Sequence, residues 1–432
     1  LLPLANNGGL TKTHALDACS PALDAGNPSD SSPDQIGTAP QGFARDIGAY
    51  EDAVGANLVV STTADAGCGS LRRVVQNAPP GSTITFDASL YGDTIRLTGG
   101  QIEIDKDLTI QGPGSGLLAI AEGGRHLNLL AGNTINVSGL SFANAYTIAG
   151  QGGSIRCGSI STFSDCVFRN NTLEATGDAY GGAIHLEPTA DLTLTVCRFE
   201  GNEARSLAAS GRGGALFSAG GSTLTATDCT FEGNQAIGGN TALGGAIMLF
   251  SGASFTRCTF ADNRAEGIGT EGVGGAIFWR EGGGTIDRCT FSGNTAEGPT
   301  IALGGALELN RSVYDIKRST FTGNAVLGGG TAEAGGIHAA DGATARFDNT
   351  ILAGNTSDGT RPDIDVVGAT VISNGYNLIG NRDGMSWPTA TGDIVGTSGS
   401  PIDPFLLPLA DNGGLTKTHA LDACSPALDA GN

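Results

Sequence analysis

The chain has 432 residues, of which 70 are glycine, 39% are hydrophobic and only 15% are charged. Glycine at more than twice its usual frequency disfavours a helical protein, the missing Gly-X-Y period excludes collagen, and the apolar fraction excludes a disordered linker. The net charge of −20 disfavours nucleic acid and anionic membranes as partners. No apolar run is long enough for a transmembrane helix, and no signal peptide is visible. The composition therefore predicts an all-β chain with many tight turns.

The chain repeats its own beginning. Residues 1–27 recur at residues 406–432, and the only difference is Asn6 against Asp411. Physical convergence does not produce such near-identity, so we expect a tandem array with a 405-residue period. The alternative is a protein that carries two copies of one short module. In the array, residues 1–54 would belong to the preceding unit, 55–115 would form an opening cap with the first coils, 116–365 the main coils, and 366–432 a closing module that leads into the duplicated junction.

A second, shorter period of about 30 residues fills the middle of the chain. It consists of a Cys-x-Phe-x-x-Asn motif and a Gly-Gly-Ala-Ile motif, each followed by alternating apolar and polar residues. In later copies Ser319 and Thr350 replace the cysteine. The repeated positions are Cys166, Cys197, Cys229, Cys258 and Cys289; Phe168, Phe199, Phe231, Phe260, Phe291 and Phe321; and Asn171, Asn202, Asn234, Asn263, Asn294 and Asn324.

Alternation with period two indicates strands, and a strand unit of this length cannot bury its own apolar face. Stacked in parallel, equivalent residues of neighbouring units lie about 4.8 Å apart. The sequence therefore predicts a parallel β-helix with one coil per repeat. The phenylalanines form an inward stack, and the asparagines form a row at a turn whose amides bond the coils above and below.

The cysteine row has three interpretations: a metal–thiolate ladder, disulfides between coils, or buried thiols that pack as small apolar groups. Serine and threonine at the same position favour buried thiols. Cys19 and Cys68 lie outside the row, and we hypothesise a disulfide between them that ties the end of one unit to the start of the next. The absence of CxxC and CxxCH motifs argues against structural zinc and c-type haem.

Three stretches of the sequence resemble modules of bacterial surface proteins. The segment with Cys68, Ser70, Leu71 and Arg72 resembles the CSLREA-type opening module, although Gly69 is inserted and Arg73 replaces a glutamate. The coils resemble the right-handed β-helix repeats of polymorphic outer-membrane proteins. The motifs GYNLIG, LADNGGLTKTHAL, SPALDAGN and DIGAYE resemble the choice-of-anchor Q closing module. The resemblance implies a right-handed β-helix and a location outside a bacterial cell.

No catalytic constellation is recognised, so the sequence predicts no enzyme. The outward residues of the Gly-Gly-Ala-Ile strands contain no clustered acid pair, and Asp363 and Asp365 are expected in a solvated turn. Phe217, Met248 and Phe278 are expected to form an apolar contact stripe, unless a loop of the same coil covers it. Oxygen ligands could bind Ca²⁺ in the first loops, although turns rich in Asx residues are the favoured interpretation there; the candidates are Asp24, Asn27, Asp30 and Asp34. No other cofactor is expected.

The favoured function is structural: a unit of a secreted, tandemly repeated β-helix that forms a fibre or stalk on a bacterial surface. Its expected partners are copies of itself, end to end and laterally. The alternative is a glycan-binding adhesin or a polysaccharide lyase or hydrolase built on a β-helix, with glycans as partners.

Overall fold

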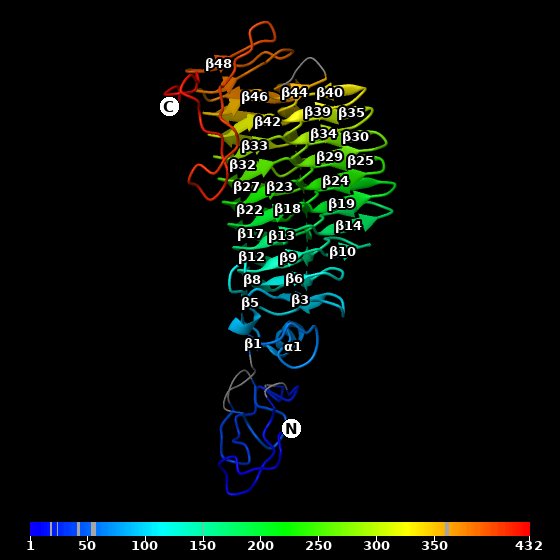
Figure 1. Ribbon diagram of the computed structural model, residues 1–432, viewed down its shortest axis with the longest axis vertical. Coiled ribbons are helices and arrows are strands. Elements are labelled where there is room, and N and C mark those ends of the chain that lie inside the picture. Colours follow the sequence, from blue (N-terminus) through cyan, green and yellow to red (C-terminus); the bar gives the residue numbers. More distant parts are fainter. Residues whose placement is uncertain (18–19, 24, 41–43, 53–57, 149, 359–362) are drawn as a thin grey trace.

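A computed structural model of the chain describes residues 1–432 except 18–19, 24, 41–43, 53–57, 149 and 359–362. Short parallel strands stack into a long solenoid, and residues 1–52 form loops before its first coil (Figure 1). The stack opens with helix α1 (Leu71–Asn77), followed by the 3-10 helix η1 (Ala88–Leu90). The hydroxyl of Ser70 caps α1 by accepting from the Arg73 backbone N–H, and the helix buries Leu71 among the first strands.

The strands form five parallel sheets, and each coil contributes one strand to most of them. Sheet 1 has twelve strands: β1 (Val59–Val60), β2 (Ser82–Phe86), β5 (Leu108–Gln111), β8 (Thr134–Ser138), β12 (Ile160–Ser164), β17 (Asp191–Thr195), β22 (Thr223–Thr227), β27 (Gly252–Thr256), β32 (Gly284–Asp287), β37 (Val313–Lys317), β42 (Thr344–Asp348) and β46 (Thr370–Ser373). Sheet 2 also has twelve strands: β3 (Thr94–Arg96), β6 (Ala119–Ala121), β9 (Ser141–Ala143), β13 (Val167–Arg169), β18 (Arg198–Glu200), β23 (Thr230–Glu232), β28 (Thr259–Ala261), β33 (Thr290–Ser292), β38 (Thr320–Thr322), β43 (Ile351–Leu352), β47 (Leu378–Ile379) and β48 (Ile394–Val395).

Sheet 3 carries the Gly-Gly-Ala-Ile strands and has ten members: β4 (Ile102–Ile104), β7 (Leu127–Leu129), β11 (Ile155–Cys157), β16 (Ile184–Leu186), β21 (Leu216–Ser218), β26 (Ile247–Leu249), β31 (Ile277–Trp279), β36 (Leu307–Asn310), β41 (Ile337–Ala340) and β45 (Ile364–Val367). Sheet 4 has eight: β10 (Tyr146–Thr147), β14 (Thr172–Ala175), β19 (Glu203–Ser206), β24 (Gln235–Gly238), β29 (Arg264–Gly267), β34 (Thr295–Glu297), β39 (Ala325–Leu327) and β44 (Thr356–Ser357). Sheet 5 has six: β15 (Ala179–Tyr180), β20 (Ser210–Arg212), β25 (Thr241–Leu243), β30 (Glu271–Val273), β35 (Ile301–Leu303) and β40 (Thr331–Glu333).

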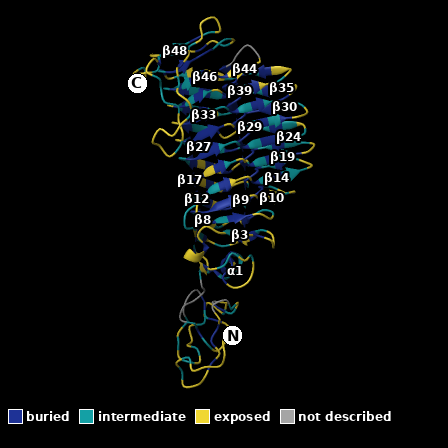
Figure 2. Ribbon diagram, viewed as in Figure 1, coloured by how far each residue is buried: buried dark blue, intermediate teal, exposed yellow. Residues whose placement is uncertain are grey.

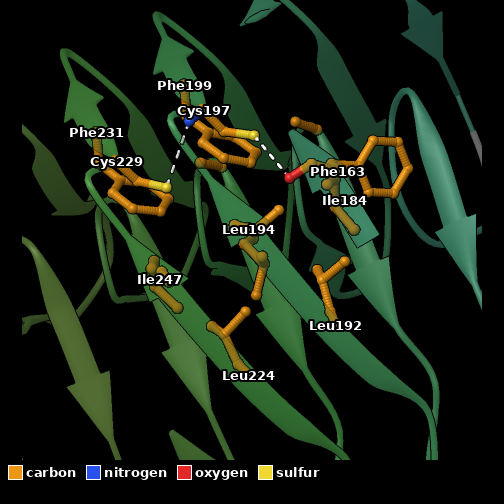
Figure 3. Close-up of a cluster of buried hydrophobic side chains, with 14 of the residues drawn as sticks. Phe163, Ile184, Leu192, Leu194, Cys197, Phe199, Leu224, Cys229, Phe231 and Ile247 are labelled. Atoms are coloured by element: carbon orange, nitrogen blue, oxygen red, sulfur yellow. Dashed lines mark hydrogen bonds between the residues drawn. The ribbon is translucent and has the colours of Figure 1, made fainter. Parts of the chain in front are cut away.

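Sheets 1, 2 and 3 enclose the main core, which is continuous along the stack (Figure 2). Its apolar side chains come from alternate positions of each strand, and Figure 3 shows phenylalanines, leucines and isoleucines of neighbouring coils pointing into it. The six phenylalanines of the predicted stack lie in register on sheet 2, with neighbouring ring centroids 4.5–4.8 Å apart and planes within 10° of parallel. One aromatic ring per coil therefore fills the middle of the core.

Sheets 4 and 5 form a side lobe with a small core of its own. In each coil the chain runs outward along sheet 4 and returns along sheet 5, and the two sheets meet through alanines such as Ala236, Ala242 and Ala265. At the end of the return, the paired glycines turn the chain into sheet 3. Gly213 has a φ of +64°, and a Cβ on Gly214 would lie 2.1 Å from the carbonyl oxygen of Gly245 in the next coil. The positive φ and the close approach explain why both positions are glycine.

The asparagine row joins the coils at the turn between sheets 2 and 4. Each side-chain oxygen accepts from the backbone N–H and from the Nδ2 of the asparagine one coil earlier, and each Nδ2 also donates to a phenylalanine carbonyl. For Asn234 these distances are 3.0 Å from the Asn202 N–H, 2.9 Å from the Asn202 Nδ2 and 2.9 Å to the Phe199 oxygen. The asparagines from Asn171 to Asn324 are fully buried. Their amides therefore satisfy the backbone groups that a turn leaves unpaired inside the stack.

Candidate functional site

The cysteine row lies inside the stack and is a packing feature. Its five thiols are buried and free, and the sulfur of Cys229 accepts from the Cys197 backbone N–H at 3.5 Å. The hydroxyl of Ser319 accepts from the Cys289 N–H at 3.1 Å in the same way. Burial raises the pKa of the Cys197 thiol, so the thiolate that would bind a metal or attack a substrate is disfavoured. A small side chain with a weak acceptor is what this position requires.

Cys68 is disulfide-bonded. Its predicted partner, Cys19, lies outside the described residues, so the pairing stays a prediction. Cys424, which repeats Cys19 in the second copy of the duplicated segment, is a free and exposed thiol.

The predicted calcium loop consists of turns in its described part. The Asn27 side chain accepts from the Ser29 N–H, and Asp34 accepts from the N–H groups of Ile36 and Thr38. Asp30 forms an ion pair with Arg45 at 3.1 Å. Asp24 lies outside the described residues, and within the described part of the chain no three His, Cys, Asp or Glu side chains form a group that could hold a metal ion.

The predicted contact stripe is not a surface. The side chains of Phe217, Met248 and Phe278 point outward from sheet 3, but they are only 6%, 0% and 7% exposed. Val273 and Leu243 of sheet 5 pack against them, so the side lobe covers the stripe. The expectation of an exposed stripe is therefore wrong, and the alternative that the same coils cover it is correct. Alternation within a strand gives the outward direction, but it does not reveal the second layer.

The stripe is the middle of a seam between two facing rows, one on sheet 3 and one on sheet 5. Both rows follow the strand register, and both change from polar to apolar and back to polar along the stack. The sheet 3 row is Glu103, Asn128, Arg156, His185, Phe217, Met248, Phe278, Glu308, His338 and Asp365. The sheet 5 row is Tyr180, Arg212, Leu243, Val273, Leu303 and Glu333.

The end of the seam nearer the N-terminus is rich in arginine and open to solvent. Arg156 Nε lies 2.6 Å from Glu187 Oε1, and its side chain is 44% exposed. His185 Nε2 lies 3.6 Å from the same carboxylate. Burial lowers the pKa of His185 to about 4, so its imidazole is neutral at pH 7. Arg125 belongs to the same cluster, because the charge of Arg156 adds to the effect of burial in lowering its pKa.

An aromatic ring and a third arginine lie on the sheet 5 side of this cluster. The guanidinium of Arg212 lies 5.2 Å from the ring centroid of Tyr180, within range of a cation–π contact. Asp178 orients both residues, since its Oδ2 is 2.9 Å from the Tyr180 hydroxyl and 2.9 Å from Arg212 Nη2. The Tyr180 ring meets His185 edge-on at 6.0 Å. We call Arg125, Arg156, His185, Tyr180 and Arg212 the arginine cluster.

A cavity of about 580 Å³ adjoins the arginine cluster at the opening cap. Arg72, Gln101, Glu103 and Lys106 are among its lining residues, and Gln101 also accepts a hydrogen bond of 2.8 Å from Arg125. Arg72 is held by an ion pair of 2.7 Å with Asp65. The cavity and the arginine cluster together present cationic and amide groups on one side of the solenoid.

The far end of the seam holds a buried carboxylate–imidazole–carboxylate group. His338 Nδ1 lies 2.7 Å from Glu308 Oε2, and His338 Nε2 lies 3.6 Å from Asp365 Oδ2. Burial lowers the pKa of His338, but the two carboxylates outweigh it and raise that pKa above its usual value. The expectation of no clustered acids is therefore wrong. The three side chains are at most 6% exposed, so the group binds coils together and is closed to a substrate.

Asp363 and Asp365 were expected in a solvated turn, and both are buried instead. Asp365 pairs in register with His338, although the step from Ile337 to Ile364 is only 27 residues. Asp363 ends the asparagine row, because its Oδ1 accepts from the backbone N–H of Asn355 at 3.0 Å and from its Nδ2 at 2.8 Å. The short last coil hides this register from a search based on constant spacing.

The duplicated segment provides a further candidate surface, because its second copy docks on the outside of sheet 2. Thr416 Oγ1 donates to the Arg257 carbonyl at 3.1 Å, and the Lys417 carbonyl accepts from Thr259 Oγ1 at 2.6 Å. Lys417 Nζ lies 3.2 Å from Glu232 Oε1. One step further along sheet 2, His419 Nε2 lies 3.0 Å from Ser292 Oγ. The segment thus follows three successive strands, β23, β28 and β33, along the side of the stack (Figure 1).

The sequence matches the family model of the right handed beta helix region over residues 93–275 and 214–381, which together span more than half of the chain. The chain belongs to this family. Its fold is a right-handed parallel β-helix, as the sequence predicted, and the matched residues cover most of the coils. The finer resemblance to an opening and a closing module concerns residues largely outside this match. No curated protein matches the chain.

Among solved structures, this β-helix is similar to a mannuronic acid specific polysaccharide family 6 lyase from human gut microbiota, at 11% identity and a TM-score of 0.33, covering 75% of this chain and 87% of the lyase. It is also similar to tailspike protein 3 of bacteriophage CBA120, at 11% identity and a TM-score of 0.31, covering 76% of this chain and 56% of the tailspike. An alginate lyase solved with a bound ligand is similar at 13% identity and a TM-score of 0.29, covering 84% of this chain and 90% of the lyase.

These similarities correct one prediction made from the sequence. The chain was expected not to be an enzyme, yet polysaccharide lyases are among the structures to which it is similar. That expectation is therefore wrong as stated, and enzymatic activity is compatible with this fold. Separately, the described part of the chain contains no helix long and apolar enough to cross a membrane.

Proposed function

We propose that the chain is one unit of a tandemly repeated β-helix that forms a stalk or fibre outside a bacterial cell. The observation that carries this proposal is the duplicated segment. Its second copy closes one side of the coils that precede it, and its first copy precedes the opening cap of the same coils. A segment that closes one stack and leads into the next is what a tandem array of stacks requires.

Two further observations support this proposal. Cys68 is disulfide-bonded, which suits an oxidising compartment outside the cytoplasm. The core is continuous from the strands of the opening cap to those beyond Asp363, so the unit is a rod whose length grows with the number of coils. In this proposal, residues 55–115 act as the opening module, and residues 366–405 together with the equivalents of residues 1–52 act as the closing module.

The mass of the native polypeptide under denaturing conditions, together with electron microscopy of native material, tests this proposal. We expect a polypeptide mass of several 405-residue periods and filaments whose axial repeat matches the length of one unit. A native chain with a single coil stack, or the absence of elongated particles, would contradict the proposal.

A second function is favoured by the arginine cluster: binding, with or without cleavage, of an acidic polysaccharide. Three guanidinium groups lie around an aromatic ring and a neutral imidazole, next to an open cavity of about 580 Å³. Guanidinium groups pair with sugar carboxylates in a bidentate fashion, and aromatic rings stack on sugar faces. Glu187 and Asp178 neutralise part of this charge, so the cluster would suit a single acidic sugar rather than a long run of them.

Binding of uronate oligosaccharides to the purified chain tests this second function. We expect the double variant Arg156→Ala/Arg212→Ala to lose binding, and Arg264→Ala, which removes an arginine from sheet 4 outside the cluster, to retain it. New unsaturated sugar ends, followed by ultraviolet absorbance, would reveal cleavage. Equal binding by all three chains would exclude the arginine cluster as the site.

A further inference from the structure

The duplicated segment folds into the same hairpin in both of its copies. In each copy an antiparallel bridge joins equivalent residues, an asparagine Nδ2 donates to a threonine carbonyl, and the histidine Nδ1 lies within 2.8 Å of a leucine carbonyl. The equivalent contacts are Ala5 to Thr13 and Ala410 to Thr418, Asn7 to Thr13 and Asn412 to Thr418, and His14 to Leu2 and His419 to Leu407. The hairpin is therefore set by its own sequence and is independent of its surroundings.

The two copies are covered on opposite faces. In the second copy, Thr416 and His419 contact sheet 2 and are half-buried, whereas Thr418 on the other face is exposed. In the first copy this is reversed, because the equivalent of Thr418, Thr13, is only 4% exposed and its neighbour Leu16 is also buried. A hairpin has two faces, so each copy shows how one of them is covered.

Residues 28–52 provide the cover of the first copy. Gln35 Nε2 donates to Thr11 Oγ1 at 2.7 Å, and the Ile47 N–H donates to the Ala22 carbonyl at 2.8 Å. A Cβ on Gly9 would lie 2.6 Å from the side chain of Ile36, so the two segments pack closely. No equivalent of this cover packs on the second copy within the described residues.

The face that binds sheet 2 in the second copy is open in the first. Thr11, Lys12 and His14, the equivalents of Thr416, Lys417 and His419, are all exposed. Lys12 and His14 line a cavity of about 380 Å³, together with Leu4 and Ile47, which are 54% and 57% exposed. Exposed apolar side chains around an open cavity, next to polar groups whose copies are engaged elsewhere, are typical of a contact surface.

We propose that residues 1–52 bind the outer surface of sheet 2 in a second copy of this unit. This proposal rests on the proposed tandem array and identifies how its units are joined. In it, the Lys12 amine lies against the Glu232 carboxylate of the second copy, as Lys417 does within this chain, and the Lys12 carbonyl accepts from the Thr259 hydroxyl. The complete joint has three layers: the coils, the hairpin, and the cover formed by residues 28–52.

The Lys12–Glu232 pair marks the register of this joint but contributes little to its stability. Its equivalent in this chain is partly exposed, with the Lys417 and Glu232 side chains at 47% and 34% exposure. Exposed ion pairs add little free energy because water screens them. The hydrogen bonds to strand residues and the apolar residues around the cavity provide the contact area.

A two-unit chain, in which a second copy of residues 28–405 directly precedes Leu1, tests the proposal. A zero-length carbodiimide reagent joins a lysine to a glutamate only when their side chains touch. Proteolytic peptides that contain Lys12 carry Asn6, whereas those that contain Lys417 carry Asp411, so mass spectrometry distinguishes the two crosslinks. The crosslink from Lys417 to Glu232 of the second unit is the internal positive control.

We expect Lys12 to be crosslinked to Glu232 of the first unit to a similar extent as Lys417 to that of the second. Glu232→Gln in the first unit alone should abolish the Lys12 crosslink and leave the Lys417 crosslink unchanged. A crosslink from Lys417 only would overturn the proposal, and so would the absence of both, because the docking contact itself would then be missing. Failure here would leave the native mass and the filaments untouched, so the two proposals are tested separately.

Discussion

The asparagine row predicts a large loss of stability when one buried amide is removed. In Asn234→Ala, three polar groups lose their partner at once: the Phe199 carbonyl, the Asn202 backbone N–H and the Asn202 Nδ2. Leaving a buried polar group unsatisfied costs about 1–3 kcal/mol. Water that enters the gap would satisfy part of this, so we expect a loss of roughly 3–6 kcal/mol in the free energy of unfolding.

Urea unfolding at pH 7, followed by circular dichroism and by the fluorescence of the buried Trp279, measures this loss. Asn240→Ala is the matched control, because it removes an exposed asparagine from the same coil and should change stability by less than about 0.5 kcal/mol. If Asn234→Ala unfolds within experimental error of Asn240→Ala, the row does not stabilise the stack and the reasoning is refuted. Two unfolding transitions in the variant would show instead that the row is what makes neighbouring coils unfold together.

Three further outcomes follow from individual side chains. Burial raises the pKa of Asp363 to about 6, so the stability from its bound proton is present below pH 3.8 and is lost as the pH rises through 6; this slope of about 3 kcal/mol in the free energy of unfolding should be absent in Asp363→Asn, and an unchanged slope would assign it to another group. Under native conditions iodoacetamide should modify the exposed Cys424 but none of the six buried free thiols, which mass spectrometry would count before and after unfolding. Phe231→Ala should cost about 3–5 kcal/mol in urea unfolding because the ring is fully buried between two others, and a loss below about 1 kcal/mol would mean that the stack closes over the gap.

The repeat period made the inner core accessible to prediction. A constant step of about 30 residues places equivalent side chains one above another, and alternation then selects those that point inward. Phe231 and Asn234 could be assigned in this way, because packing in the core and pairing at the turn require the same residue type in every coil. The register of the coils therefore follows from sequence spacing alone.

The outer layer could not be predicted in the same way. Alternation showed that Phe217 points out of sheet 3, but the strands of sheet 5 that cover it are three residues or fewer and carry no repeated motif. The group around His338 was missed for a different reason. Its partner Asp365 belongs to a coil of 27 residues, so a constant step places another residue opposite the imidazole. The arginine cluster likewise combines residues from four coils whose outward positions differ from coil to coil.

The asparagine row has a direction, and Asp363 ends it. From Asn171 to Asn355 every Nδ2 donates toward the next coil, so the amide dipoles align along the stack with their positive ends toward Asp363. A carboxylate accepts from Asn355 but has no proton to hand on, so the row cannot continue into another coil. Asp363 therefore acts as a terminator that fixes how many coils share the row. A coil inserted before it would need an asparagine at this turn, whereas a coil added after it would not.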